Sequence, residues 1–311
     1  MRSEHGGQVA AALLLDAVLG EPPEAVHPTV LMGRAISAFE QRALKMQCPR
    51  SRRLAGIFLA LAMPSLTFFS TRKVLEALPG GLRWTTETAL ISTALSMRGL
   101  AEAAGSVEYA LNGGSLRAAR IRVARFVGRD THELSEPEVC RAAVESVAEN
   151  TSDGIVAPML YGLLFGAPGA LAYKAVNTLD SMVGHQEPPY REFGWASARL
   201  DDLANLAPSR IMTLAVAASS GRPLRTLGMT HRYGPLTVSP NAGMAEAAFA
   251  GALGVRLGGT NSYGGVSRSG AILGEGRAPV SDDIRRAVKL MRRCCLLLCI
   301  PALVRWRPGR G

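Results

Sequence analysis

Residues 155–173 read IVAPMLYGLLFGAPGALAY, a charge-free run that contains two prolines and three glycines. Its length approaches the roughly 20 apolar residues that a membrane-spanning helix needs. Ala167-Pro168-Gly169 places a turn signal in the middle of the run. We therefore expect a broken or re-entrant hairpin here rather than one straight helix. Irregular backbone of this kind is tolerated where protein buries it.

Other apolar runs point to the same fold class. Residues 54–71 are also free of charge, and residues 294–304 form a shorter run between arginines. These runs are rich in Ala, Leu and Gly and lack the alternation that strands show, which favours helix. We expect an all-α, polytopic helical membrane protein with broken or re-entrant helices, built as a single domain over residues 1–311.

Local signals mark the starts of two further helices. Ser135 is a candidate N-cap, and Glu138 three residues later completes a capping-box pattern that opens a helix over residues 135–149. Ser281-Asp282-Asp283 similarly opens a last helix over residues 282–298. Between these helices, glycine pairs such as Gly258-Gly259 and Gly264-Gly265 indicate loops.

The composition of the chain limits the classes of molecule that it is expected to bind. The chain is 48% hydrophobic yet carries a formal charge of +10, with basic clusters at residues 34–53, 117–129 and 285–293. Anionic lipid headgroups or a phosphate-bearing substrate would explain the clusters. Nucleic acid is the weakest interpretation, because aromatics are only 5% and the basic clusters flank apolar runs. The five cysteines form no CxxC pair, so we expect reduced, mostly buried thiols.

Polar residues concentrate on both sides of the run 155–173. Glu145 and Glu149 are four residues apart on one helix face, and Asn150 and Asp153 follow them. Like charges at this spacing repel each other, whereas a divalent cation would hold them together. Hard oxygen ligands of this kind suit Mg²⁺. Two glutamates on a solvated helix face are the simpler alternative.

Two more polar stripes follow the run. Asn177 and Asp180 share a helix face with Lys174, and Arg199, Asp202 and Asn205 recur at intervals of three, with Arg210 beyond. Polar residues within apolar helices are costly and tend to be functional. Asp202 could instead simply pair with Arg199. The chain has no GxxxxGK[ST] loop and no dinucleotide fingerprint.

At this point the motifs resemble a known family. LLLDAVLGEPPEAVHPTVLMGRAI (13–36), ESVAENTSDGIVAPMLYGLLFGAPGALAYKAVNTLDSMVGH (145–185), FGWASARLDDLANLAPSRI (193–211) and NAGMAEAAFAGALGVRLGG (241–259) are similar to motifs of the CobD/CbiB cobalamin-biosynthesis family. These are the adenosylcobinamide-phosphate synthases, or cobinamide synthases. The resemblance covers most of the chain and is least distinctive over residues 43–133 and the last forty residues.

The resemblance implies an enzyme of the bacterial inner membrane with several transmembrane helices. It implies amide formation between a carboxyl of adenosylcobyric acid and aminopropanol or its O-phosphate, with ATP and Mg²⁺. The family motifs bring no individual catalytic assignments, so the roles that follow are our own. A homo-oligomer or a partner subunit stays open, as does phosphorylation of the amine.

Amide formation at neutral pH needs an activated carboxylate, and an acyl phosphate made from ATP would supply one. Metal-ligand candidates are the carboxylates Glu145, Glu149, Asp153 and Asp180. Lys174, Arg199 and Arg210 are candidates for phosphate charge, and Asp201 or Asp202 for accepting the amine proton. Asn150, Asn177 and Asn205 would orient substrate or phosphate oxygens. In the N-terminal motif, Asp16, Glu21, His27 and Arg34 are expected to line the same site, with a capped turn between two helices as the alternative.

Topology follows from the location of ATP on the cytoplasmic side. If the polar motifs before and after residues 155–173 share one site, a single straight span would separate them, which again favours a hairpin. Six Lys and Arg precede residues 54–71 within residues 34–53, and three follow within residues 72–83, so the first flank is expected to be cytoplasmic. A membrane transporter and a non-catalytic membrane partner protein are the alternatives. The dense charged cluster outside the apolar runs favours the ligase.

Overall fold

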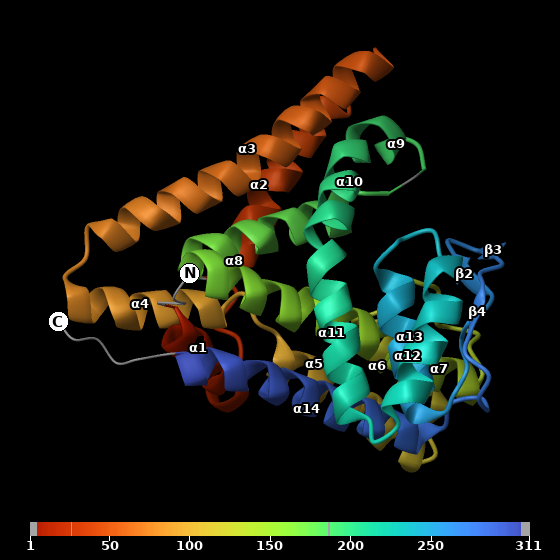
Figure 1. The fold of residues 1–311 in the computed structure, drawn as a ribbon. Helices are drawn as coiled ribbons and strands as arrows, with labels where there is room; N and C mark the ends of the chain where they lie inside the picture. The colour runs from red at the N-terminus through yellow and green to blue at the C-terminus, as the bar shows by residue number, and fades with distance from the viewer. Residues whose placement is uncertain (1–4, 26, 186, 306–311) are drawn as a thin grey trace. The chain divides into compact units, whose positions relative to one another are not determined.

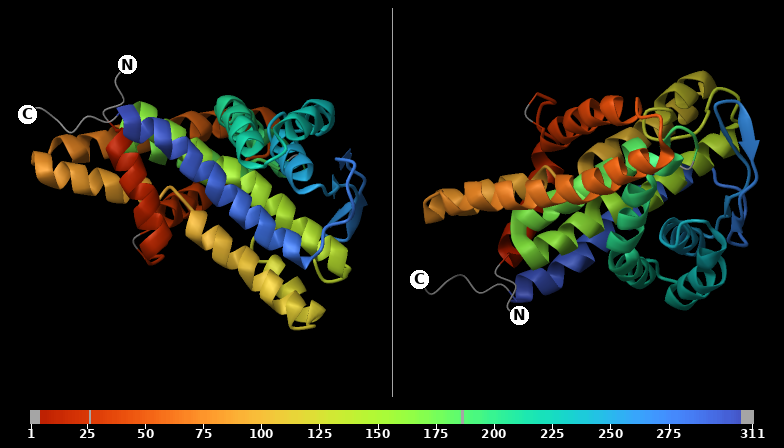
Figure 2. Two further views of the ribbon diagram at one scale, coloured as in Figure 1. Left: turned by 60° about the horizontal axis from the view of Figure 1, so that its bottom comes forward. Right: turned by 90° about the horizontal axis from the view of Figure 1, so that it is seen from above.

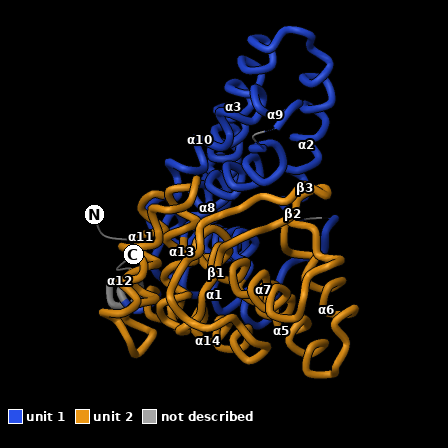
Figure 3. The backbone as a smooth tube through the Cα atoms, turned by 90° about the vertical axis from the view of Figure 1, so that its right-hand side faces the viewer, with its two compact units in different colours: residues 1–96, 157–205, 299–311 blue, residues 97–156, 206–298 orange. Residues whose placement is uncertain are grey.

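A computed structural model describes residues 5–25, 27–185 and 187–305 of the chain. The chain divides into two compact units (Figure 3). Unit 1 contains residues 1–96, 157–205 and 299–311, and unit 2 contains residues 97–156 and 206–298. The expectation of a single domain stays a prediction.

Unit 1 is helical in its described part. Its elements are α1 (Gly6–Leu19), α2 (Pro28–Ala43), α3 (Pro49–Glu76), α4 (Gly80–Ser92), α8 (Ala157–Val183), α9 (Tyr190–Phe193) and α10 (Trp195–Ala204). Helix α8 packs against α1, α2, α3, α4 and α10, and Figures 1 and 2 show the long α3 alongside it. A core of buried residues that includes Ile36, Leu179 and Phe193 joins α2, α8 and α9.

Helix α8 is a hairpin of two helical arms (Figure 1). Its backbone breaks at Gly166, where φ is 68° and ψ is −158°. In one straight helix Tyr161 and Tyr173 would lie about 18 Å apart along the axis. Their rings instead stack with centroids 5.1 Å apart. The prediction that this run is broken into a hairpin is therefore confirmed, whereas its re-entry from one side of a membrane stays a prediction.

Glu87 of α4 holds the turn of the hairpin. Its side chain is 4% exposed and lies 3.2 Å from His5. It accepts hydrogen bonds from the side chain of Gln8 at 3.0 Å and from the backbone N–H of Ala167 at 3.3 Å. Ala167 begins the second arm, so Glu87 satisfies one of the N–H groups that a helix start leaves open. A Cβ on Gly166 would collide with this carboxylate.

Unit 2 is built around α7 (Glu136–Thr151), most of whose residues are buried. The other elements are α5 (Met97–Asn112), α6 (Leu116–Val123), the π-helical turn η1 (Ser152–Val156), α11 (Leu206–Ser219), α12 (Pro223–Tyr233), the 3₁₀ turn η2 (Gly234–Leu236), α13 (Ala242–Leu253) and α14 (Ser281–Arg305, of which residues 281–298 lie in this unit). The predicted capping box is present, because Glu138 accepts hydrogen bonds from the N–H and the hydroxyl of Ser135. The last helix also begins at the predicted residues.

The glycine-rich region of unit 2 adds short strands to the expected all-α fold. β1 (Leu257–Gly258) pairs with β4 (Ile272–Leu273), and β2 (Asn261–Tyr263) pairs with β3 (Val266–Arg268), both antiparallel. Gly264 and Gly265 turn the β2–β3 hairpin with positive φ angles of 57° and 80°. Glycine is the residue that adopts such angles without strain. The all-α prediction is otherwise confirmed.

Two helical segments are long and apolar enough to cross a membrane. In the most apolar part of Pro49–Glu76, 22% of residues are buried, whereas in that of Glu136–Val183 the share is 67%. The second segment is interrupted by η1 and reverses at Gly166. Pro49–Glu76, which is α3, is therefore the better candidate for a lipid-facing helix. Residues 294–304, expected as a third membrane element, belong to α14, which is not among the candidate spans of the described residues.

The cysteines agree with expectation. All five are free thiols, of which Cys48 is exposed and the other four are buried.

Candidate functional site

The predicted site residues of α8 and α10 meet around Asp201 in unit 1. The Asn205 amide donates to Oδ2 of Asp201 at 2.9 Å, and the Tyr173 hydroxyl donates to Oδ1 of Asn205 at 2.8 Å. Asp201 is 9% exposed and Asn205 is 1% exposed. The side chains of Tyr173, Asn205 and Asp201 thus form a buried series of hydrogen bonds that fixes the orientation of the Asp201 carboxylate.

Asp201 has an unusual electrostatic environment. Burial, together with the negative charge of Asp202, raises the pKa of Asp201 to about 6, although hydrogen bonds from Asn205 and Asn177 oppose the shift. Its other oxygen, Oδ1, is buried and accepts no hydrogen bond among the described residues. A carboxylate with one uncommitted oxygen and a pKa near neutrality is suited to accept a proton.

Asp180 of α8 and Asp202 of α10 both interact with Asp201 through their charges. The charges of Asp201 and Asp202 both act on the carboxyl of Asp180. Asp202 lies with Oδ2 at 3.7 Å from Nη1 of Arg199, whose side chain is 67% exposed. Arg199 pairs with Asp202, as the alternative to a functional stripe expected, whereas Asn205 donates its hydrogen bond to Asp201.

The N-terminal motif also lies in unit 1. His27 caps α2 by accepting the N–H of Thr29 on Nδ1 at 3.2 Å. Burial lowers the pKa of His27, the charge of Glu21 opposes this, and the charge of Lys174 adds to it. Lys174 is therefore close enough to His27 to act on it. Asp16 is fully buried in α1, and Arg34 is exposed on α2.

In unit 2, Glu145 is held by two arginines and a strand. Oε2 of Glu145 lies 2.6 Å from Arg129, and Oε1 lies 3.6 Å from Arg141 and accepts the N–H of Gly258 at 2.6 Å. Its side chain is 2% exposed. Arg141 also donates to the carbonyl oxygens of Gly258 and Thr260. Glu145 thus joins α7 to β1, and its oxygens are occupied by protein donors.

One turn further along α7, Glu149 meets Glu246 of α13. The two carboxyl groups hydrogen-bond to each other, which requires a proton on one of them. Burial, and then the charges of Glu149 and Glu145, raise the pKa of Glu246 well above its usual range. Buried carboxyls so close together cannot both be ionised, so the pair holds a proton at neutral pH.

Unit 2 contains three more of the predicted site residues, Asn150, Asp153 and Arg210. Asp153 belongs to η1, a π-helical turn of a kind that is frequent at functional sites. The Asn150 side chain donates to the carbonyl oxygen of Ser146 at 2.9 Å. Arg210 donates to Oδ1 of Asn241 at 2.6 Å and to the Ser209 hydroxyl at 2.9 Å. The side chains of Asn150 and Arg210 are therefore both hydrogen-bonded to other groups of the protein.

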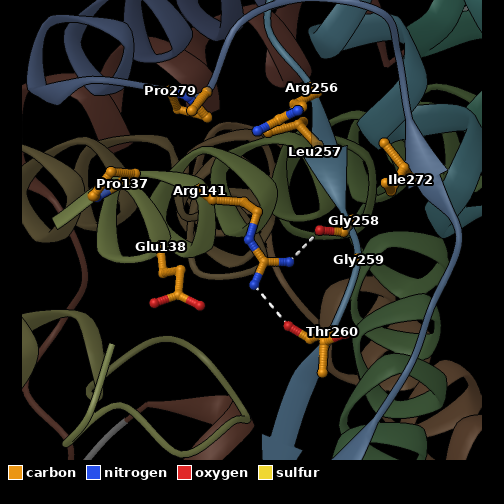
Figure 4. A pocket seen from close by; sticks show the side chains of 11 residues that line it. Pro137, Glu138, Arg141, Arg256, Leu257, Gly258, Gly259, Thr260, Ile272 and Pro279 are labelled. Atoms are coloured by element: carbon orange, nitrogen blue, oxygen red, sulfur yellow. Dashed lines mark hydrogen bonds between the residues drawn. The ribbon is translucent and has the colours of Figure 1, made fainter. Parts of the chain in front are cut away.

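A cavity of about 360 Å³ opens beside Arg141 (Figure 4). It is lined by the first turns of α7, by β1 with the residues after it, and by Arg256. Figure 4 shows Arg141 holding the carbonyl oxygens of Gly258 and Thr260 along one wall. None of the predicted site residues lines this cavity.

The four metal-ligand candidates do not form a ready-made metal site. Glu145, Glu149 and Asp153 belong to unit 2 and Asp180 to unit 1. In the part of the chain that the structure describes, no three His, Cys, Asp or Glu side chains are arranged to hold a metal ion. Mg²⁺ itself needs only one or two carboxylates when phosphate and water complete its shell. Among the four candidates, Asp180 is the one whose carboxyl is acted on by the charges of Asp201 and Asp202.

Sequence reasoning missed Glu87, Arg129, Arg141 and Glu246. Glu246 was detectable, because it is the single acidic residue in the apolar run of residues 242–255. Glu87 was similarly isolated within residues 84–97. The roles of the two arginines depend on partners more than a hundred residues away, Asn261 for Arg129 and Gly258 for Arg141.

Comparisons with known proteins agree on one family. A family model described as "CobD/Cbib protein" matches residues 9–291. "Cobalamin biosynthesis protein CobD" of Geobacter metallireducens is 43% identical, covering 97% of each chain. The CobD protein of Synechocystis is 41% identical over 88% of this chain and 83% of its own, and "Cobalamin biosynthesis protein CbiB" of Salmonella typhi is 40% identical over 90% and 91%. No solved structure matches the chain.

Proposed function

The chain belongs to the CobD/CbiB family, and from this premise we propose that it acts in cobalamin biosynthesis as an ATP-dependent amide ligase. Its substrates would be adenosylcobyric acid and (R)-1-amino-2-propanol or its O-phosphate, and its product adenosylcobinamide or adenosylcobinamide phosphate. The names of the relatives support a role in cobalamin biosynthesis. The proposal that this chain forms the amide bond rests on the chemistry of the site.

The reaction needs activation of the corrinoid carboxylate and a group that accepts a proton from the amine nitrogen. The carboxylate oxygen of the corrinoid attacks the γ-phosphorus of ATP, and ADP leaves. The amine then attacks the acyl carbon, the bond to the phosphate oxygen breaks, and inorganic phosphate leaves. The nitrogen loses a proton in forming the amide. A buried base of near-neutral pKa suits that last requirement.

Asp201 is the observation that carries this proposal. Its pKa of about 6 lets it stay ionised at neutral pH and still take a proton, and the series of hydrogen bonds from Tyr173 through Asn205 fixes its orientation. Asp180 would hold Mg²⁺ together with phosphate and water, and the ion would supply charge neutralisation for the phosphates when bound. Lys174, whose charge acts on His27, would provide a cation for phosphate or for charge that develops in transfer.

Membrane attachment is part of the proposal. The exposed apolar surface of α3 supports a helix in the bilayer, with the Arg-rich flank of residues 34–53 on the cytoplasmic side. We place the chain in the inner membrane as a multi-pass protein whose active site faces the cytoplasm, where ATP is available. A homo-oligomer or a partner subunit is compatible with this arrangement.

Complementation tests the function in cells. A bacterial strain that lacks its own family member, supplied with adenosylcobyric acid, should regain cobalamin-dependent growth when it expresses this chain. Asp201→Asn should abolish rescue, because an amide cannot accept the proton. Asp282→Asn, which alters an exposed carboxylate paired with Arg285, should rescue fully. Rescue by Asp201→Asn at wild-type rate would remove Asp201 from the mechanism.

A further inference from the structure

An apolar groove of about 440 Å³ lies in unit 1 among α3, α8 and α10. Phe68, Tyr161, Phe165, Tyr173 and Leu203 are among its lining side chains. The hydroxyls of its tyrosines are already used, since Tyr161 donates to the carbonyl oxygen of Ala204 at 3.0 Å and Tyr173 donates to Asn205. The groove therefore offers aromatic faces without free hydrogen-bond donors from these rings, a surface that favours hydrocarbon.

A second cavity, of about 270 Å³, adjoins the groove. Phe68 and Phe165 line both, and their rings meet edge to face at 6.4 Å. The second cavity carries charged side chains, Arg72 and Glu76 from the end of α3 and Arg83 and Glu87 from α4. Pro64, at the apolar end, and Arg72 are about 12 Å apart along α3. Together the two cavities make a site with one apolar end and one charged end.

The charged end carries both signs. The Nε of Arg72 donates to Oε1 of Glu76 at 2.7 Å. Glu87 is buried to more than nine-tenths and is held by Gln8 and Ala167. The guanidinium of Arg83 has no hydrogen bond or ion pair among the described residues, although its charge acts on Glu76 and Glu87. A phosphate would find Arg83 and Arg72 there, and a neighbouring ammonium group would find Glu76.

The orientation of the site matches that of a lipid beside α3. Leu54, Phe58 and Leu61 are 67%, 62% and 60% exposed and form one apolar stripe. The charge-free stretch of residues 54–71 is about 27 Å long, close to the thickness of a hydrocarbon core. Arg72 follows it directly and thus lies at headgroup depth, while the apolar groove extends back toward the middle of the helix.

We propose that these two cavities bind one bilayer glycerophospholipid. Its acyl chain lies in the groove between α3, α8 and α10, and its phosphate binds Arg83 and Arg72. The mixed charge of the second cavity favours a headgroup that carries an amine beside the phosphate. The inference rests on the membrane location of α3 proposed above, but not on the ligation reaction.

Native mass spectrometry of the full chain in mild detergent tests the site, with phosphatidylethanolamine of defined chains as the probe. The wild-type chain should retain one lipid. Arg83→Gln should lower the retained fraction about tenfold by removing the phosphate partner, and Ala172→Phe should do the same by filling the groove. Arg225→Gln and Ala38→Phe, at exposed positions outside both cavities, should retain lipid as the wild type does.

Three outcomes would overturn the inference: no retained lipid on the wild-type chain, full retention by both Arg83→Gln and Ala172→Phe, or equal retention of a diacylglycerol with the same chains. The last would show an apolar cavity without headgroup recognition. Circular dichroism confirms that the variants are folded. A chain that fails to enter the membrane fraction defeats the membrane proposal. A membrane-bound chain without retained lipid defeats the lipid site alone.

Discussion

Asp201 and Asp202 are adjacent in α10, yet their surroundings differ. Asp201 is buried and bonded to Asn205, whereas Asp202 faces the exposed side chain of Arg199. Burial is what separates an ordinary surface carboxylate from one whose pKa reaches about 6. This difference in burial is the reason we propose Asp201, rather than Asp202, as the proton acceptor.

The spacing of polar residues in the sequence predicted the residues around Asp201, but it could not show which of them are buried. Asn177, Asp180, Asp201 and Asn205 were all predicted site residues, and the structure joins them through charge or hydrogen bonds. Which face of α10 is buried depends on the helices packed against it, and a ten-residue helix with mixed polarity does not reveal that. Glu246 was detectable as a lone acidic residue, but its pairing with Glu149, 97 positions away in the chain, could not be predicted from spacing.

His27 makes the stability of α2 depend on pH. Its pKa is lowered in the folded chain, so its contribution is present above the ordinary pKa of about 6.5 and is lost as the pH falls. A protonated Nδ1 cannot accept the N–H of Thr29. Protonation of His27 should remove, between pH 7 and pH 5, on the order of the 1 kcal/mol of a cap. This loss is read as the difference in unfolding free energy between the wild type and His27→Asn, because carboxyls with a raised pKa such as Asp201 contribute the opposite trend equally to both chains. Chemical denaturation at each pH measures this.

His27→Asn provides the matched comparison, since asparagine caps a helix without titrating in this range. The variant should equal the wild type at pH 7 within about 0.5 kcal/mol and lose less stability at pH 5. Identical pH profiles for the two chains would exclude His27 as the titrating group.

At the scale of elements, the α8 hairpin follows from local sequence to an unusual degree. Ala167-Pro168-Gly169 and the surrounding glycines predicted the break, and the backbone reverses at Gly166. The sequence could not show what stabilises the reversal. Glu87 lies 80 positions from Ala167, whose N–H it accepts. A turn signal is local, whereas the partner that satisfies the new helix start is not.

Gly166→Ala tests the hairpin turn. The backbone at Gly166 lies in a region that only glycine occupies readily, at a cost of about 1–3 kcal/mol for other residues. The new Cβ would also displace Glu87. The variant should lose more than about 2 kcal/mol of unfolding free energy. Gly105→Ala, inside α5 with open space around it, should be neutral or gain about 0.5–1 kcal/mol. Equal effects of the two changes would contradict this account of the turn.

Glu145→Gln tests the link between α7 and β1. The change leaves Arg129 buried without its carboxylate, which typically costs about 3–5 kcal/mol. Glu102→Gln breaks a pair of the same charge types with Arg98 on the surface and should cost under about 1 kcal/mol. Thermal unfolding of both variants measures the difference. A loss as small for Glu145→Gln as for Glu102→Gln would mean that the buried pair does not hold β1.

At the scale of the whole molecule, hydropathy and burial give different information. Residues 54–71 and 155–173 are both charge-free, but α3 has few buried residues in its most apolar part and α8 folds back on itself. Composition could predict apolar helices, but it could not decide which of them meet lipid, because that depends on what the rest of the chain covers. The short strands of residues 257–273 were missed because each has two or three residues.

The proposed ligase places proton transfer at Asp201, nucleotide activation nearby and the apolar surface of α3 in the bilayer. Each of these three proposals can be tested separately, but formation of the amide is the test of the function itself. The direct measurement uses the purified chain in detergent with adenosylcobyric acid, aminopropanol phosphate, ATP and Mg²⁺, followed by mass spectrometry of the corrinoid. We predict adenosylcobinamide phosphate together with one ADP per product. Absence of the amide product, with or without an added partner protein, would contradict the proposed function.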